Sequence, residues 1–171
     1  MNDFVDTRHW PLVGLHMPER VPGECADGLM AQLKALYARA EPFVLLMRGV
    51  ELPRHSARFM AAYAQWSRDN LALQRRYCLG AVRIEADEAQ RREYARKADA
   101  WNASGHAPYP YRIVATSEEA RAQAIALISG PHPASTDEQP GSQSRSPSPG
   151  LSGRPQAGPA SDNPHEPPSH A

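Results

Sequence analysis

Cationic side chains gather where the sequence passes from its clearest apolar run into a long helical segment. Arg48 directly follows the run 43–47, and Arg54, His55 and Ser56 come at the start of the next expected helix. Guanidinium groups and the free N–H groups of a helix N-terminus are typical partners of bound anions. Arg48, Arg54, His55 and Ser56 are therefore the candidate residues for contact with a ligand or a partner. The alternative interpretation is that both arginines are solvated loop charges and that His55 is a surface residue.

Other residues with chemical potential are better explained by structure. Cys78 lies inside an apolar run, which favours a buried, inert thiol over a nucleophile. Glu85 and Asp87 could form a carboxylate pair, but Asp87 is already explained as a helix cap. The sequence has no glycine-rich phosphate loop, nucleophile elbow, HExxH or CxxC motif, and its seven histidines are scattered. We therefore expect no catalytic set, no cofactor and no metal ion.

The elements that would position these residues follow from an alternation of apolar runs with helical segments. The clearest runs are 43–47, 78–84 and 111–115, and each is followed by helix signals. Short strands are also expected at 4–7 and 10–17, with Pro11 suited to an edge or a strand start. This rhythm is typical of parallel βαβ units. The prediction is one small α/β domain with a central, mostly parallel sheet of four to five strands and about four helices.

The expected helices span about 26–40, 53–76, 87–102 and 116–128. Asp87 with Gln90 and Thr116 with Glu119 are capping pairs that mark two helix starts. The third of these helices carries few core residues and should be the most exposed one. Gly80 lies inside the expected strand 78–84 and indicates that a helix packs closely against that strand. In an open parallel sheet, ligands bind beyond the carboxyl ends of the strands. Arg48, Glu85, Asp87, Thr116 and Ser117 would stand at those ends.

Composition divides the chain at Gly130. Residues 131–171 contain ten prolines and eight serines but no aromatic residue, so we expect a disordered tail after a domain at 1–130. The whole chain has 19 basic and 19 acidic side chains, a balance that argues against nucleic acid as a partner. No apolar run approaches a membrane span. Two cysteines make no disulfide framework, so we expect a cytoplasmic protein.

The order of elements resembles the STAS/SpoIIAA-like domains, the superfamily that includes anti-sigma factor antagonists. The resemblance covers about residues 4–129 and is carried by the segments WPLV, PFVLLM, AYAQW, CLGAV and PYPYRIVATSEEA. It implies a domain that binds partners rather than one that catalyses a reaction. Arg48 stands where the antagonists carry an acidic residue, and Ser56 is the only hydroxyl near the position of their phosphorylated serine.

Two functions follow as hypotheses. The first is a non-enzymatic regulatory or protein–protein interaction module with an unidentified protein partner. The alternative is a small-ligand protein that binds an anion, a nucleotide or a lipid at the strand ends and the helix N-terminus.

Overall fold

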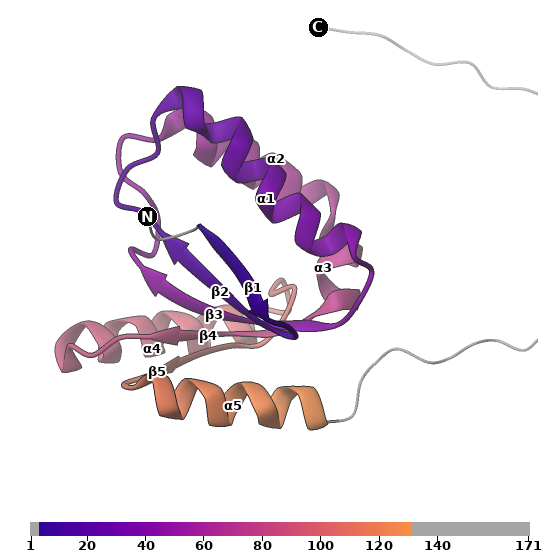
Figure 1. Ribbon diagram of the computed structural model, residues 1–171. Helices are drawn as coiled ribbons and strands as arrows, with labels where there is room; N and C mark the ends of the chain where they lie inside the picture. The colour runs from indigo at the N-terminus through magenta and orange to yellow at the C-terminus, as the bar shows by residue number, and fades with distance from the viewer. Residues whose placement is uncertain (1–3, 131–171) are drawn as a thin grey trace, which may run out of the picture. The chain divides into compact units, whose positions relative to one another are not determined.

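The computed structural model describes residues 4–130, and this range contains five strands and five α-helices (Figure 1). The elements are β1 (Val5–His9), β2 (Leu12–Met17), the 3₁₀ turn η1 (Gly23–Cys25), α1 (Ala26–Ala38), β3 (Phe43–Gly49), α2 (Ala57–Asp69), α3 (Leu71–Tyr77), β4 (Cys78–Ile84), α4 (Glu88–Ala103), β5 (Tyr111–Val114) and α5 (Ser117–Ser129). The predicted α/β class is confirmed. The predicted tail at 131–171 lies outside the described residues.

The five strands form one sheet in the order β1-β2-β3-β4-β5. β1 pairs with β2 antiparallel, and the other three pairs are parallel, as the apolar rhythm predicts. Pro11 precedes β2, and its carbonyl oxygen accepts a hydrogen bond from Val44 N at 2.9 Å. Of the two positions expected for this proline, the strand start is therefore the correct one. The carboxyl ends of β2 to β5 all lie at the same edge of the sheet.

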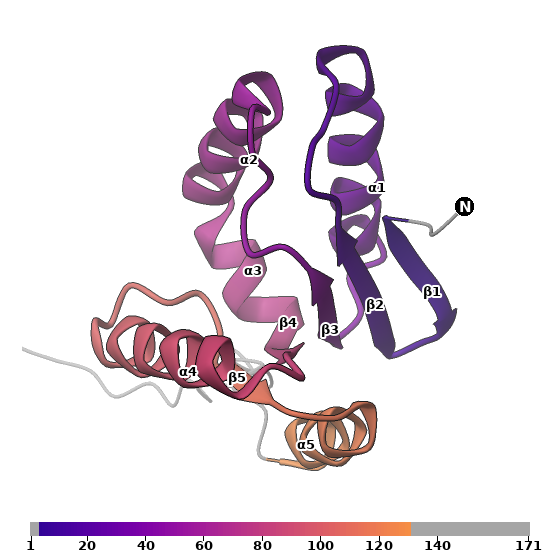
Figure 2. The ribbon, with the colours of Figure 1, turned by 90° about the vertical axis from the view of Figure 1, so that its left-hand side faces the viewer.

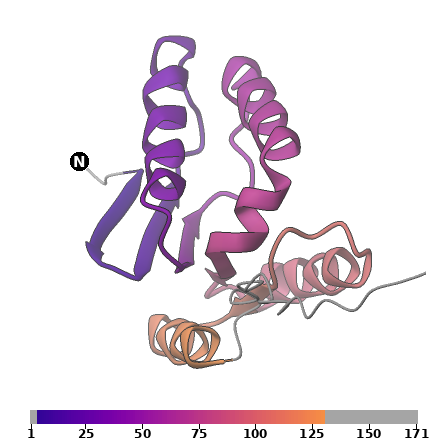
Figure 3. The same ribbon diagram turned by 90° about the vertical axis from the view of Figure 1, so that its right-hand side faces the viewer.

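The two faces of the sheet are covered unequally. Helices α1, α2 and α3 pack over one face, while α5 lies against β3 and β4 on the other (Figures 2 and 3). Along β2 the side chains alternate between these faces. Val13, Leu15 and Met17 are buried under the helices, whereas Leu12 and His16 point to the opposite side and are only half-buried. Among the described elements, no helix covers β1 and β2 on that side.

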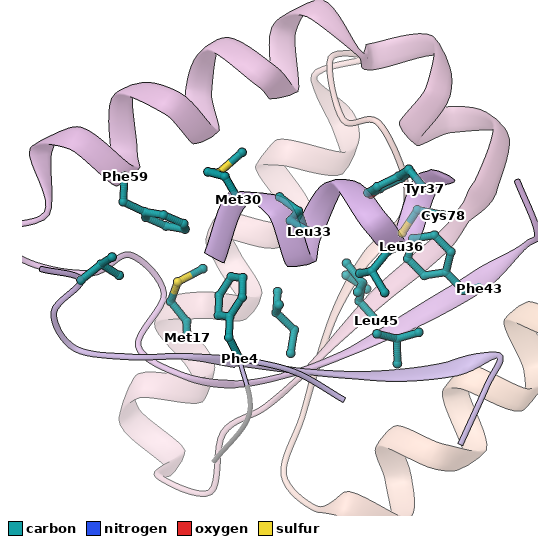
Figure 4. Packing of buried hydrophobic residues seen from close by; sticks show 14 of the residues in the cluster. Phe4, Met17, Met30, Leu33, Leu36, Tyr37, Phe43, Leu45, Phe59 and Cys78 are labelled. Carbon is teal, nitrogen blue, oxygen red and sulfur yellow. The ribbon is translucent and has the colours of Figure 1, made fainter. Parts of the chain in front are cut away.

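The main core lies between the sheet and α1 to α3 (Figure 4). Phe43 is fully buried there, with its ring centroid 5.1 Å from that of Tyr37 and 5.5 Å from that of Trp10. Cys78 belongs to the same core and is 2% exposed, which confirms the buried thiol. Burial raises the pKa of this thiol to about 12, so it stays protonated at neutral pH.

A smaller core joins α5 to the other face of the sheet. Gly80 permits this contact, because a Cβ atom at Gly80 would come within 2.7 Å of the Cδ1 atom of Leu127. The close helix approach predicted from Gly80 is thus confirmed. Thr116 and Glu119 form the predicted capping box at the start of α5, and the Asp87 carboxylate accepts from Gln90 N at 2.8 Å at the start of α4.

The helix expected from 53 to 76 is wrong in two respects. It begins later, at Ala57, and it is divided into α2 and α3 at Asn70, whose φ of −117° and ψ of 29° lie outside the helical region. The Asn70 side chain donates to Trp66 O at 2.8 Å, which satisfies a carbonyl at the break. The division explains why five α-helices, rather than about four, occur in the described residues. The expected exposure of α4 is confirmed, since Ala98 is its one buried residue and a larger share of its residues is exposed than in the other helices.

Candidate functional site

A groove with a volume of about 810 Å³ lies on the sheet face that α5 covers only in part. We call it the sheet groove. Its lining residues come from β1 to β4 and from the start of α5: Asp6, Arg8, His9, Leu12, Gly14, Leu15, His16, Leu46, Arg48, Ile84, Ser117, Glu118 and Arg121. The groove exists because α5 packs on β3 and β4 and leaves β1 and β2 without a covering helix (Figure 2).

Apolar side chains form part of the floor of the sheet groove. Leu12, Leu46 and Ile84 come from β2, β3 and β4, and all three are half-buried against the α5 core. Gly14 adds no side chain to this floor, and a Cβ atom there would stand 3.3 Å from the Asp6 Cβ atom. The groove thus offers an occupant an apolar surface as well as charged side chains.

Arginines stand around this floor at the carboxyl end of the sheet. Arg48, at the end of β3, donates from Nη2 to Ser117 Oγ at 2.7 Å, across 69 positions of sequence. Arg121 lies one turn further along α5 and is exposed. The strand-end residues Arg48 and Ser117, which the sequence placed at one edge, therefore meet in the folded chain. Glu118 in the first turn of α5 is the acidic neighbour of this group.

A second charged group stands on β1 at the other side of the groove. Arg8 donates to the Asp6 carboxylate through Nε at 2.9 Å and through Nη2 at 2.6 Å. These hydrogen bonds hold the pKa of the Asp6 carboxyl well below its usual range. The pair is internally neutralised, and Glu118 offsets one of the two charges of Arg48 and Arg121, so the net positive charge of the groove lies at their end.

The structure separates the residues that the sequence grouped as one site. Arg48 lines the sheet groove, but Arg54, His55 and Ser56 do not. Arg54 and His55 are exposed ahead of α2, and the backbone N of Arg54 donates to Glu19 O at 2.7 Å. Arg48 and the N-terminus of α2 therefore lie on opposite sides of the sheet, because α2 packs over the face of the main core.

Ser56 has a structural role in this arrangement. It is 4% exposed, its Oγ accepts from Val21 N at 2.7 Å, and it donates to Arg54 O at 2.9 Å. The hydroxyl makes no side-chain cap for α2. A kinase would reach this hydroxyl only after the segment around Val21 had opened.

Sequence reasoning missed Arg8, His16 and Arg121 as groove residues. Each has a local explanation as an exposed charge or as part of a short strand, and the sequence gives no reason to group them. The alternation along Leu12–Met17 was the available signal, since it places Gly14 and His16 on the face opposite the buried Val13 and Leu15. Arg83 was also missed, inside what reads as an apolar strand.

Within residues 4–130, no group of three or more His, Cys, Asp or Glu side chains is placed to hold a metal ion. In the same part of the chain, no helix combines the length and the apolar character needed to cross a membrane. Comparisons of the chain with family models, with curated proteins and with solved structures find no match.

Proposed function

We propose that this domain is a non-enzymatic binding module and that the sheet groove takes an acidic, amphipathic segment of a protein partner. The observation that carries the proposal is the combination of an apolar floor with arginines at one end of the groove. An occupant with one apolar face and acidic flanks would complement both parts. Burial of its apolar side chains would supply most of the affinity, and the charges would set its orientation.

The width of the uncovered surface supports a helical occupant. Strands of a sheet are spaced by about 4.8 Å and an α-helix is about 10 Å wide, so one helix covers about two strands, and β1 and β2 are the two that α5 leaves uncovered. A partner helix beside α5 would complete the helical layer on this face. This is the helix-in-groove mode of recognition, in which an amphipathic helix places its apolar face on an apolar surface.

The resemblance to the STAS/SpoIIAA-like domains also supports partner binding. The order β1-β2-α1-β3-α2-α3-β4-α4-β5-α5 follows the elements on which that resemblance rests. Under this proposal the serine switch of the anti-sigma antagonists does not carry over to Ser56, because its hydroxyl is buried and engaged.

The test uses the full chain and a synthetic helical peptide of about 15 residues, with leucines on one face and glutamates on its flanks. Isothermal titration calorimetry would measure its affinity for the wild type, for the double variant Arg48→Ala/Arg121→Ala, and for Arg96→Ala. Arg96 is an exposed arginine on α4 that does not line the groove, and it serves as the matched control. Two partly screened charge contacts predict a loss of about tenfold in the double variant. The affinity of Arg96→Ala should stay within about twofold of the wild type, and added salt should weaken the wild-type complex.

Three results would contradict the proposal. The double variant could bind the peptide as tightly as the wild type does. A peptide of the same composition, with its leucines spread around the helix, could bind equally well. Inorganic phosphate or pyrophosphate could bind through the same arginines while the peptide does not, which would favour the small-anion alternative.

A further inference from the structure

Arg83 is the most unusual buried residue of the described chain. It is 1% exposed, although it carries a guanidinium group, and it is among the largest fully buried side chains. Its Nη2 donates to Gly49 O, and its Nη1 lies 3.4 Å from Val50 O. Its Cζ atom lies 4.6 Å from the centre of the Tyr94 ring. Burial raises the pKa of Tyr111 in β5, and the guanidinium of Arg83, which lies beside the Tyr111 hydroxyl, opposes this rise. One strand residue thus contacts the end of β3, the helix α4 and β5.

The contacts of Arg83 compensate only in part for the free-energy cost of burying its charge. No carboxylate of the described residues forms an ion pair with it, and its buried Nε has no hydrogen-bond partner there. An apolar side chain of similar volume often serves the stability of a core as well as a buried ion does. The position therefore calls for an explanation other than packing alone, and the carbonyl groups at the end of β3 indicate one.

The contacted carbonyls belong to Gly49 and Val50, which directly follow Arg48 at the end of β3. Successive strand residues point to opposite faces, and Arg83 pairs in register with Met47 on the face of the main core. Arg83 thus holds the end of β3 from one side, while Arg48 emerges on the other side and reaches Ser117. Gly49, which follows Arg48 in the chain, has a φ of +85° and pairs with Met17 of β2.

We propose that Arg83 is a positioning residue for the sheet groove. It fixes the end of β3, and this keeps the Arg48 side chain beside the N-terminus of α5, where it can contact the occupant of the groove. This inference rests on the proposed function of the groove. Tyr94 contributes by holding the guanidinium of Arg83 against its ring. Lys97 stands 5.7 Å from the same ring centre and 3.8 Å from the Glu51 carboxylate, which ties α4 to the residue that follows Val50.

The test is a double-mutant cycle on the affinity for the leucine–glutamate peptide described above. Arg83→Met removes the donors but keeps an unbranched, apolar side chain in the core. It should weaken binding by about threefold in the wild-type background, which is the share of one of the two arginines, and by less than about 1.5-fold in the Arg48→Ala background. A merely structural role would lower the affinity equally in both backgrounds.

A second pair of variants avoids the core and keeps the test open if Arg83→Met fails to fold. Tyr94→Phe retains the ring face and should bind as the wild type does. Tyr94→Leu loses the cation–π contact and should weaken binding by about threefold, again only when Arg48 is present.

The outcomes separate the two proposals. If Arg48→Ala binds the peptide as tightly as the wild type does, the proposed function of the groove is refuted, because Arg48 then makes no contribution to the affinity. If Arg48→Ala weakens binding but Arg83→Met and Tyr94→Leu leave the affinity unchanged, the role of Arg83 is refuted and the groove stands. Equal losses in both backgrounds would also refute it.

Discussion

Replacing Gly49 with alanine should destabilise the domain more than most single substitutions do. Gly49 ends β3 with a φ of +85°, in the region that L-residues with a side chain rarely adopt. A Cβ atom there would stand 2.0 Å from Met17 O and 3.0 Å from the carbonyl carbon of Met17. The obstacle is the backbone of a paired strand, so it has no flexible side chain that could move aside.

The magnitude follows from these contacts. A left-handed conformation costs an alanine about 1–2 kcal/mol relative to glycine. Relief of the clash requires the ends of β2 and β3 to separate, which weakens the hydrogen bond from Val50 N to Met17 O, now 3.1 Å long. A lost hydrogen bond of this kind costs about 1 kcal/mol, and overpacking adds about 1–3 kcal/mol. We expect Gly49→Ala to lower the free energy of unfolding by about 3–6 kcal/mol.

Urea unfolding of the full chain, followed by far-UV circular dichroism, measures this loss as a fall in the midpoint at constant slope. The matched control is Gly28→Ala in α1, where a Cβ atom would meet nothing within 4 Å. That substitution should raise the free energy of unfolding by about 0.5–1 kcal/mol, because alanine has a higher helix propensity than glycine. A Gly49→Ala variant within about 1 kcal/mol of the wild type would refute the assigned geometry at the end of β3.

Two further predictions concern buried polar groups. Cys25 is exposed and should react with a thiol reagent in the native protein, whereas Cys78 should react only on unfolding. Because burial raises the pKa of Cys78 from 9.0 to about 12, its contribution to stability is complete below pH 9 and is lost between pH 9 and 12. The free energy of unfolding should then fall by up to about 1.4 kcal/mol per pH unit, and Cys78→Ala should lack this part of the slope in alkaline urea titrations. Ser56→Ala leaves Val21 N without its partner and should cost about 1–2 kcal/mol in urea unfolding, where an unchanged midpoint would contradict the structural role of the hydroxyl.

Helix boundaries show where sequence reasoning succeeds and where it stops. The starts of α4 and α5 were predictable because each cap joins residues three positions apart, as Thr116 and Glu119 do. The break at Asn70 was not predictable, since the apolar stripe continues across it from Phe59 to Leu73. The sequence period favours one helix, but packing against α1 and β4 selects two shorter ones.

The candidate site was predictable only in part, for a related reason. Arg48 could be placed at a strand end, and the parallel sheet put Ser117 at the same edge. The structure places α2 over the other face of the sheet from the groove that Arg48 lines, and the sequence has no signal for which face each helix covers. Arg83 escaped notice because an arginine near a strand end is usually solvated. Here Tyr94 and the end of β3 close over it.

The sequence by itself determined the alternation of strands and helices, the parallel sheet, the two capped helix starts and the close approach at Gly80. These features depend on residue period, capping and side-chain size, which act between near neighbours or within one element. The tertiary structure decided that α5 covers only part of its face of the sheet. That choice creates the sheet groove and brings Arg48 and Ser117 together across 69 positions. On the other face, the packing of α4 and of the end of β3 buries Arg83. Such contacts depend on how whole elements pack, and the local pattern of the chain does not contain that information.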